Sequence, residues 1–420
     1  MTTNLTIAPG VTLRVLPTDK FKAGYIGINF IRQHDRENAP LDALLPSVLF
    51  SAMEKYPDIR SISRYLDELY GASFGNATRR RGEAKIINFS TNFIEDCFLP
   101  EKEGIFHSIV EFLGEAVFHP YTENGCFAAS VVERQKQEIL NSIDAKLNNK
   151  QSYAVEQMFK IMCADENFGV PPLGYREDVE KITPQMLWQH YQEVLRTSRI
   201  EIFYAGRQPA ETVAAEFAPM FRREEQQWAA AETQNIREVK QVREVSEAMD
   251  VTQGKLIMGL RTGITCEDED YAALFLLNTV LGGSVTSKLF VNVREKMSLC
   301  YYAQSAINNL KGIMLISAGI AFKDYEVAKN AILHELEECK KGNITEKELE
   351  NARRQVRSVL KMAMDIPADL EDYYVTMALA AYEDIPEFAE HISRLTVADL
   401  AAAAKKIQLD TIYFLKGEEK

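Results

Sequence analysis

The sequence repeats part of itself 232 residues further along the chain. Residues 44–49 read Leu-Leu-Pro-Ser-Val-Leu, and residues 276–281 read Leu-Leu-Asn-Thr-Val-Leu. A second correspondence links the ends of the two copies, where Thr183, Leu187, Phe203 and Gly206 match Thr396, Leu400, Phe414 and Gly417. A chain with two such copies is expected to build the same unit twice, so the repeat limits the choice of fold more than any other feature.

Each copy has the same order of predicted elements. In the first copy, strands within residues 11–31 precede an apolar helix at 41–53, and a pair of alternating strands follows at 72–79 and 84–93. The strand pairs are joined by short hairpins, which favour antiparallel pairing because parallel strands need a longer crossover. The sequence therefore predicts an α+β fold of two homologous domains, each a mainly antiparallel sheet with helices packed on one face.

The expected boundaries follow from composition. Residues 223–248 are charged, lack glycine and proline and carry few large apolar groups, which is typical of a linker with some helical character. We therefore assign residues 1–222 to the first domain and residues 249–420 to the second.

The charge and the apolar segments limit the class of partner. The net charge of −13 argues against nucleic acid or an anionic membrane as the main partner. The N-terminus lacks a basic stretch followed by an apolar core, and no apolar run approaches the roughly 20 residues that a membrane span needs. The six cysteines are scattered without a Cys-x-x-Cys pair, as expected for reduced and mostly buried thiols. We expect a cytoplasmic protein.

One segment of the second copy stands out, the run LGGSVTSKLFVNVREKMSLCYY at residues 281–302. Gly282 and Gly283 permit a sharp turn or a close approach of another chain segment. Ser284 or Thr286 is then a candidate cap for an amphipathic helix that reaches Arg294, and Tyr301 follows within a run of strand-forming residues.

Two interpretations of this segment are open from the residues alone. In the structural one, Arg294 caps the end of the helix and pairs with a nearby acid, Tyr301 is half-buried in the sheet, and the two glycines only make a tight turn. In the functional one, these residues bind a ligand.

This segment, together with the two-fold repeat, resembles the second-domain signature of the pitrilysin/insulinase-type zinc peptidases. The similarity extends over nearly the whole chain and is greatest to short two-domain members such as the mitochondrial processing peptidase and its bacterial relatives. The resemblance implies that Arg294 and Tyr301 are a substrate-binding pair, with Gly282 and Gly283 contributing backbone edges. Arginine can donate two hydrogen bonds to a peptide carbonyl, and a phenol can stabilise a developing oxyanion.

Active members of that family carry an inverted zinc motif, His-x-x-Glu-His, on an early helix. Here the motif positions fall on Ala43, Pro46 and Ser47, and Ser142 stands where the third ligand is expected. Alanine and proline cannot ligate zinc or activate water, and serine is a poor zinc ligand beside imidazole. We therefore expect no metal site in this chain, and zinc in a partner subunit.

Other catalytic centres are not indicated. No two of the six histidines lie within five residues of each other, so no two-histidine helical motif exists. His34 with Asp35 and Glu37 is better explained as a solvated turn, and His334 with Glu335 as part of a charged helix. Gly71-Ala72-Ser73-Phe74-Gly75 matches the letters Gly-x-Ser-x-Gly, but it is better explained as a helix stop followed by a strand than as a nucleophile elbow. The sequence has no phosphate-binding loop. We assign no catalytic residue.

The resemblance implies a role in a heteromeric enzyme. Some relatives divide the work between a chain that keeps the zinc motif and a chain that keeps only the arginine and tyrosine. The favoured hypothesis is a non-catalytic subunit that binds unstructured peptide for a homologous zinc-bearing partner. The alternative is an inactive structural or peptide-binding member of the same fold, including one that self-associates. An autonomous metallopeptidase would need zinc ligands that the sequence does not supply.

Overall fold

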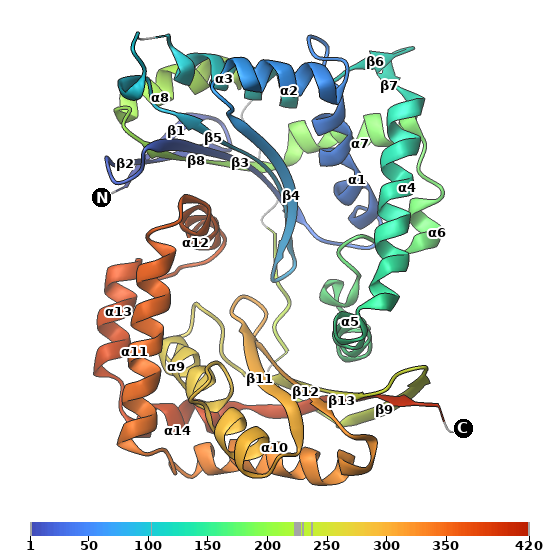
Figure 1. The fold of residues 1–420 in the computed structure, drawn as a ribbon, viewed down its shortest axis with the longest axis vertical. Coiled ribbons are helices and arrows are strands. Elements are labelled where there is room, and N and C mark those ends of the chain that lie inside the picture. The colour runs from blue at the N-terminus through green and yellow to red at the C-terminus, as the bar shows by residue number, and fades with distance from the viewer. Residues whose placement is uncertain (1, 102, 222–227, 229–230, 237, 419–420) are drawn as a thin grey trace. The chain divides into compact units, whose positions relative to one another are not determined.

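The computed structural model describes residues 2–101, 103–221, 228, 231–236 and 238–418. The chain divides into two compact units, each with its own β-sheet (Figure 1). Unit 1 comprises Met1–Asp144, Pro171–Glu232 and Pro367–Val375, and unit 2 comprises Ala145–Val170, Thr233–Ile366 and Thr376–Lys420.

The sheet of unit 1 has the strand order β1-β2-β8-β3-β5-β4, and among these neighbours β2 and β8 pair in parallel. The strands are β1 (Thr3–Ala8), β2 (Val11–Pro17), β3 (Ala23–Gln33), β4 (Ser73–Arg81), β5 (Ala84–Ile94) and β8 (Arg199–Gly206). The helices are α1 (Ala39–Ser51), α2 (Ile59–Glu68), α3 (Ile105–Phe118), α4 (Ala129–Ala145), α6 (Arg176–Val179), α7 (Pro184–Thr197) and α8 (Ala210–Phe217). A short hairpin of β6 (Thr122–Glu123) and β7 (Cys126–Phe127) precedes α4.

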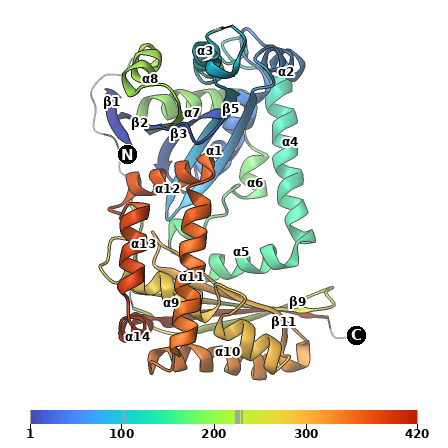
Figure 2. The ribbon, with the colours of Figure 1, turned by 60° about the vertical axis from the view of Figure 1, so that its left-hand side comes forward.

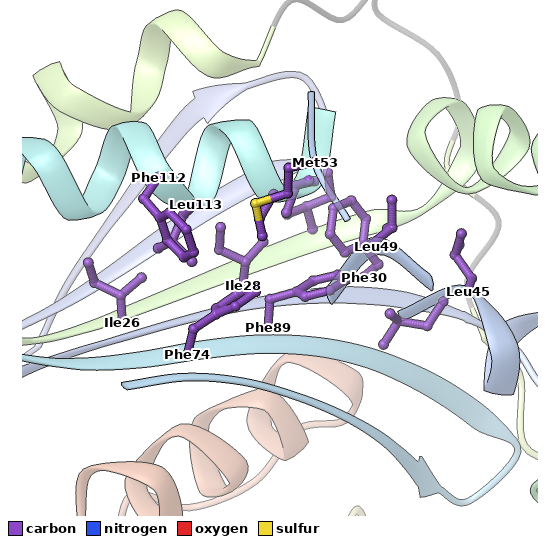
Figure 3. Packing of buried hydrophobic residues seen from close by; sticks show 14 of the residues in the cluster. Ile26, Ile28, Phe30, Leu45, Leu49, Met53, Phe74, Phe89, Phe112 and Leu113 are labelled. Carbon is purple, nitrogen blue, oxygen red and sulfur yellow. The ribbon is translucent and has the colours of Figure 1, made fainter. Parts of the chain in front are cut away.

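The core of unit 1 lies between one face of this sheet and the helices. In β3, alternate residues Ile26, Ile28 and Phe30 are buried on this face, where they meet side chains of α1 and α3 (Figure 3). Successive side chains of a strand point to opposite faces of the sheet, so the alternation that predicted this strand from the sequence also separates the residues that face the core from the others. The opposite face of β3 carries Tyr25, Gly27 and Asn29.

The sheet of unit 2 has the strand order β11-β12-β10-β13-β9. Figure 2 shows this unit from a second direction, with its strands β9 and β11 labelled. The strands are β9 (Arg243–Met249), β10 (Gly254–Arg261), β11 (Cys300–Asn308), β12 (Ile313–Ile320) and β13 (Gln408–Gly417). The helices are α5 (Lys150–Met162), α9 (Tyr271–Leu281), α10 (Tyr325–Lys340), α11 (Glu346–Ala363), α13 (Ile385–Arg394) and α14 (Val397–Lys406), with a π-helix, η5 (Leu289–Lys296). Helix α12 (Pro367–Leu379) begins in unit 1 and ends in unit 2.

The two sheets confirm the predicted repeat. The order β2-β8-β3-β5-β4 in unit 1 corresponds to β9-β13-β10-β12-β11 in unit 2, and each series starts with its parallel pair. The other pairings in both series are antiparallel, as the short hairpins predict. The chain is thus an α+β protein of two homologous domains.

The units also exchange helices, which the sequence did not indicate. Helix α5, from the first half of the sequence, packs on β10 and β13 of unit 2, with Met158 and Met162 buried against Ile257 and Tyr413. In return, the first part of α12, from the second half, packs on the face of the unit 1 sheet opposite the core, next to Gly27. Each sheet is therefore covered on a second face by a helix from the other half of the sequence.

A glycine makes each of these contacts possible. A β-carbon on Gly27 would lie 1.7 Å from Oε1 of Glu371 on α12, and one on Gly259 would lie 2.5 Å from the sulfurs of Met158 and Met162 on α5. These glycines are 232 residues apart, the same offset that relates the two apolar helices. The repeat thus supplies a gap in the side-chain layer of each sheet, where the exchanged helix can approach.

The structure corrects several details of the expected organisation. The compact units differ from the halves 1–222 and 249–420, because residues 145–170 and 367–375 each lie in the other unit. The expected linker, 223–248, ends in a strand, since β9 begins at Arg243, and part of the linker lies outside the described residues. The expected strands began at residue 11, so β1 was not predicted.

Candidate functional site

The degenerate zinc-motif positions lie on two helices of unit 1. Ala43 and Pro46 are buried on α1, and Ser47 is partly buried. Helix α1 continues through Pro46, although this proline is expected to start, kink or break a helix. On α4, Ser142 is exposed and its hydroxyl donates to the carbonyl of Glu138, one turn earlier.

These side chains do not fit a zinc ion. Ala43 and Pro46 offer no lone pair, and the Ser142 hydroxyl is already engaged with its own helix. Across the described ranges of the chain, no group of three or more histidine, cysteine, aspartate or glutamate side chains is placed to hold a metal ion. The residues at the motif positions therefore supply neither the ligands nor the base of a zinc peptidase.

Asp42, the residue before the first zinc-motif position, instead makes the polar contacts of α1. Asp42 is fully buried, and Nε2 of His190 on α7 lies 2.8 Å from its Oδ1. Nε of Arg32 lies 3.9 Å from the same oxygen, while its Nη2 pairs with Glu193 at 3.0 Å. This cluster ties α1 to α7 and β3, and sequence reasoning missed it because its members are distant along the chain.

The glycines of the second-copy segment support a close approach between α9 and β11. A β-carbon on Gly282 would lie 2.5 Å from the backbone nitrogen of Ser305, and that nitrogen donates to the carbonyl of Gly282 at 3.1 Å. A β-carbon on Gly283 would lie 3.0 Å from atoms of Asn278 and Thr279 on α9. The two glycines therefore have a packing role at this turn.

Arg294 and Tyr301 are brought together at the edge strand β11. Nε of Arg294 donates to the carbonyl oxygen of Tyr301 at 2.9 Å, and Nη1 pairs with Glu295 at 2.9 Å. The guanidinium also lies over the ring of Phe290, 4.5 Å from its centre. Within the described part of the chain Nη2 has no further partner, so the N–H groups of this nitrogen are available to a ligand.

Tyr301 points into solvent. Its side chain is 69% exposed, and its hydroxyl makes no hydrogen bond to any described residue. The structural interpretation expected a half-buried tyrosine, and the structure shows instead an exposed ring beside an anchored arginine. An exposed aromatic side chain on an edge strand gains little from burial, which makes it a candidate for ligand contact.

The backbone around this pair is irregular in three places. Residues 289–296 form a π-helix, in which the amide of Met297 donates to the carbonyl of Asn292, five residues earlier. Ser298 has a φ of 53°, in the left-handed region that non-glycine residues rarely adopt. A register shift at Tyr301 makes a β-bulge between β11 and β12. Such irregularities often occur at functional sites, where they direct particular side chains.

A second polar centre, in unit 1, was not predicted. The side chain of Glu371 on α12 is fully buried and accepts hydrogen bonds from Tyr25 at 2.5 Å, Asn29 at 2.7 Å, Asn88 at 2.9 Å and Arg79 at 3.1 Å. Burial and the neighbouring carboxylate raise the pKa of Tyr25 far above its usual range, so its hydroxyl stays protonated and donates. Gly27, within β3, is the one sequence signal that could have indicated the close approach of Glu371.

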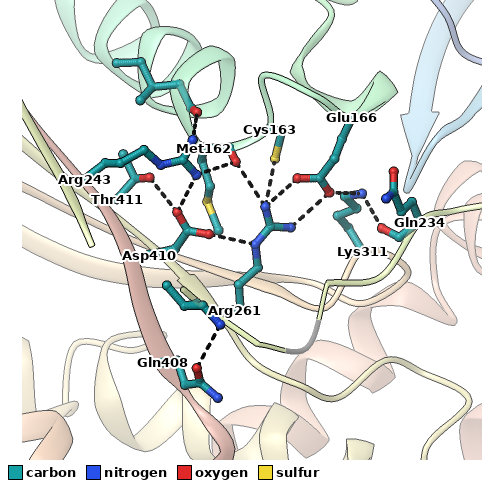
Figure 4. A network of polar contacts seen from close by, with 12 residues as sticks. Met162, Cys163, Glu166, Gln234, Arg243, Arg261, Lys311, Gln408, Asp410 and Thr411 are labelled. Carbon is teal, nitrogen blue, oxygen red and sulfur yellow. Dashed lines mark hydrogen bonds and ion pairs between the residues drawn. The ribbon is translucent and has the colours of Figure 1, made fainter. Parts of the chain in front are cut away.

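Unit 2 has a buried charged network where the loop after α5 meets the sheet (Figure 4). Arg261 on β10 pairs with Glu166 at 2.5 Å and with Asp410 on β13 at 3.1 Å, and Lys311 pairs with Glu166 at 2.6 Å. Burial alone would raise the pKa of Glu166, but the hydrogen bonds from Arg261 and Lys311 outweigh it and hold the pKa below its usual value. The network fixes the α5 segment on unit 2.

Two further findings concern the cysteines and the membrane. All six cysteines are free thiols, four of them buried, while Cys97 is exposed and Cys126 partly exposed. Among the described residues, no helix is long and apolar enough to cross a membrane.

Comparison with known proteins agrees with the fold and with the altered metal positions. Residues 181–356 match the model of the family described as "Peptidase M16 inactive domain". The chain is 31% identical over 411 residues to a Bacillus subtilis protein named "Probable inactive metalloprotease YmfF", covering 98% of this chain and 96% of that protein. It is 21% identical over 324 residues to the "Uncharacterized zinc protease YmxG" of the same organism, covering 74% and 76%. A conserved protein from Enterococcus faecalis has a similar structure, with a TM-score of 0.92, 29% identity and coverage of 100% and 99%.

The fold and the lost metal positions define an M16-type metallopeptidase homologue. The chain belongs to the pitrilysin/insulinase-type, or M16, peptidase family, and it is an inactive homologue in which the zinc-motif positions carry no zinc ligands.

Proposed function

We propose that this chain is a non-catalytic subunit of a heteromeric zinc peptidase, in which it binds peptide substrate for a homologous partner that carries the zinc. The observation that carries the proposal is the exposed pair at β11. Among the described residues, Nη2 of Arg294 and the hydroxyl of Tyr301 have no partner, and both residues lie on an irregular backbone. The positions that would hold zinc carry Ala43, Pro46 and Ser47.

The chemistry of the pair fits an unstructured peptide. A guanidinium can donate to a peptide carbonyl, and the neighbouring phenol can donate to the same or the next carbonyl. Neither group can activate water, because arginine stays protonated and an exposed tyrosine is a weak base. Hydrolysis would then depend on the partner. Support comes from the names of two Bacillus subtilis relatives, one a probable inactive metalloprotease and the other an uncharacterized zinc protease.

A second candidate function has its own support. Arg294 already holds the carbonyl of Tyr301, the carboxylate of Glu295 and the face of Phe290. An inactive structural or peptide-binding member of the fold, alone or self-associated, would use Arg294 in this way to shape the bulge of β11.

The test begins with the purified chain. We expect no stoichiometric zinc by elemental analysis and no peptide hydrolysis by the chain alone. Stoichiometric zinc, or peptide hydrolysis by the chain alone, would refute the proposal. The tagged chain is then expected to co-purify with a homologue that has His-x-x-Glu-His, and the pair to cleave unstructured peptides.

Variants separate the two candidates. In the reconstituted pair, Arg294→Ala and Tyr301→Phe should each lower kcat/KM by about ten-fold, from the loss of a hydrogen bond worth roughly 1.5 kcal/mol, without dissociating the subunits. The control is Arg354→Ala, which removes an exposed arginine of α11 that pairs only with its own helix at Glu350. Unchanged turnover in both site variants would favour the structural candidate.

A further inference from the structure

A cavity of about 950 Å³ in unit 2 lies between the start of α5 and the turn that joins β9 to β10. The turn contributes Asp250 to Gln253, the helix contributes Lys150 and Gln151, and Lys255 of β10 completes the polar lining. Most of these side chains carry hydrogen-bonding groups, and two are lysines. The cavity is large enough to admit a peptide side chain together with part of its backbone.

Both lysines lack a carboxylate partner. The ammonium group of Lys150 contacts the sulfur of Met249 at 2.9 Å, and that of Lys255 donates to the amide oxygen of Gln253. Neither forms an ion pair with any described residue, although the chain carries a net charge of −13. Other lysines of unit 2 do pair, for example Lys288 with Glu348 at 3.0 Å. Two ammonium groups held by neutral partners at one cavity favour an anionic ligand.

The surroundings of Lys255 fix it at the cavity. Tyr302, Gly319 and Lys255 are direct neighbours across β11, β12 and β10. The ammonium lies 5.6 Å from the centre of the Tyr302 ring, and a β-carbon on Gly319 would lie 2.5 Å from that ring and 2.9 Å from the Gln253 amide oxygen. The glycine therefore lets Tyr302 and Gln253 lie flat on the sheet beside the lysine. Burial also lowers the pKa of Lys255, because water is excluded from its charge.

The cavity and the proposed peptide-binding pair belong to the same unit, and Tyr302, whose ring lies beside Lys255, directly follows Tyr301 in β11. We infer that Lys150 and Lys255 form a carboxylate-binding subsite, which gives the chain a preference for peptides with acidic side chains. This inference rests on the proposed function for its peptide ligand. Asp250 also lines the cavity and pairs with neither lysine, so its charge opposes the ligand.

The experiment measures the binding of matched fluorescent peptides to the full chain by anisotropy. The peptides are unstructured and identical except for acidic positions that carry glutamate in one and glutamine in the other. The glutamate peptide is expected to bind about five-fold more tightly, as for a pair of partly exposed charge contacts, and the preference should shrink at high salt. Equal binding of the two peptides by the wild-type chain would overturn the inference.

Three variants test the assignment by the sign of the effect. Lys150→Gln and Lys255→Gln should each reduce the preference for glutamate, while Asp250→Asn should increase it. The matched control is Lys361→Gln, which neutralises a lysine on the exposed side of α11 and should leave the preference unchanged. If the two lysines had only a structural role, the lysine variants and Asp250→Asn would not change the preference for glutamate in opposite directions. If both lysine variants keep the preference, the inference is overturned.

The outcomes separate this inference from the proposed function. If Arg294→Ala weakens the binding of both peptides equally, and the lysine variants remove only the preference for glutamate, the proposed function and the subsite are both supported. If Arg294→Ala and Tyr301→Phe have no effect but the lysine variants still remove the preference, the proposed function fails and the subsite remains. Lysine-dependent binding of inorganic phosphate in calorimetry, without a preference for the glutamate peptide, would overturn the assignment of a peptide ligand.

Discussion

The contact between Gly27 and Glu371 allows a sharp test of the helix exchange in unit 1. In Gly27→Ala, the new methyl group would be placed 1.7 Å from the carboxylate oxygen of Glu371, which is far inside van der Waals contact. The backbone of Gly27 is not in the left-handed region, so alanine is not strained by its own dihedral angles. The carboxylate must therefore leave the pocket formed by its donors, and α12 must shift with it.

The magnitude follows from what the displaced carboxylate loses. Glu371 accepts from Tyr25, Asn29, Asn88 and Arg79 in a site closed to solvent. Breaking a buried, hydrogen-bonded charge pair costs about 3–5 kcal/mol. Replacing glycine by alanine recovers about 0.4–1 kcal/mol, because the unfolded chain loses freedom. We expect Gly27→Ala to lower the free energy of unfolding of unit 1 by about 2–4 kcal/mol.

The assay uses the tryptophans. The two tryptophans of the chain, Trp188 and Trp228, both lie within the sequence of unit 1, so their fluorescence reports on that unit. With a urea dependence of about 3 kcal/mol per molar, the expected loss moves the unfolding midpoint by roughly 1 M. Hydrogen exchange of residues 367–375 should rise in the same variant, because α12 is released before the sheet unfolds.

Gly75→Ala is the matched control, since it makes the same change in a strand of the same sheet. A β-carbon on Gly75 would lie 3.7 Å from its nearest neighbour, the hydroxyl of Ser90, so this variant should be neutral or slightly stabilised. In a Glu371→Ala background, Gly27→Ala should add almost no further loss, because the clashing carboxylate is absent. Similar midpoints for Gly27→Ala and Gly75→Ala would refute the reasoning.

Three further predictions concern unit 2 and the exchange as a whole. Gly259→Ala should cost only about 1–2 kcal/mol, because the flexible ends of two methionines can move aside, and hydrogen exchange of α5 measures this. The folded-state pKa of Glu166 is depressed, so its contribution to stability is complete above its unfolded pKa and is lost as the pH falls through the folded value. Arg261→Met should make the free energy of unfolding fall less steeply as the pH is lowered. Denaturation at pH 2–6 measures this. Fragments 1–232 and 233–420 should fail to fold when expressed separately and co-purify when co-expressed, since each lacks a segment of its own unit.

The sequence was sufficient for the parts of the fold that depend on local periodicity. Alternation predicted β3, β4 and β5. The repeat predicted a second sheet of the same kind. Local periodicity could not predict the helix exchange, because Tyr25 and Glu371 are 346 residues apart and their contact depends on tertiary packing. Gly27, in the interior of β3, was the one local indication.

The candidate site was predictable to a different degree. Resemblance led to Arg294 and Tyr301, but not to their geometry, since neither the π-helix nor the bulge follows from residue periodicity. The buried pair of Asp42 and His190 was not predicted, because histidines and acids distant in sequence give no spacing to recognise. Cavities have the same limitation, and Lys150 and Lys255 come from segments about 100 residues apart.

The zinc-motif positions on α1 and the segment that carries Arg294 and Tyr301 differ in what they contribute to stability. On α1, buried Ala43 and Pro46 have become part of the hydrophobic core, where a partly satisfied cluster of histidines and glutamate would be costly without its metal. At residues 289–301 the chain instead has a π-helix, a left-handed Ser298 and an exposed Tyr301. A strained non-glycine residue costs on the order of 1–3 kcal/mol, and an exposed tyrosine returns little of it. The stability of unit 2 would be served better by a regular turn, so the irregular segment accords with the proposed peptide-binding role of Arg294 and Tyr301.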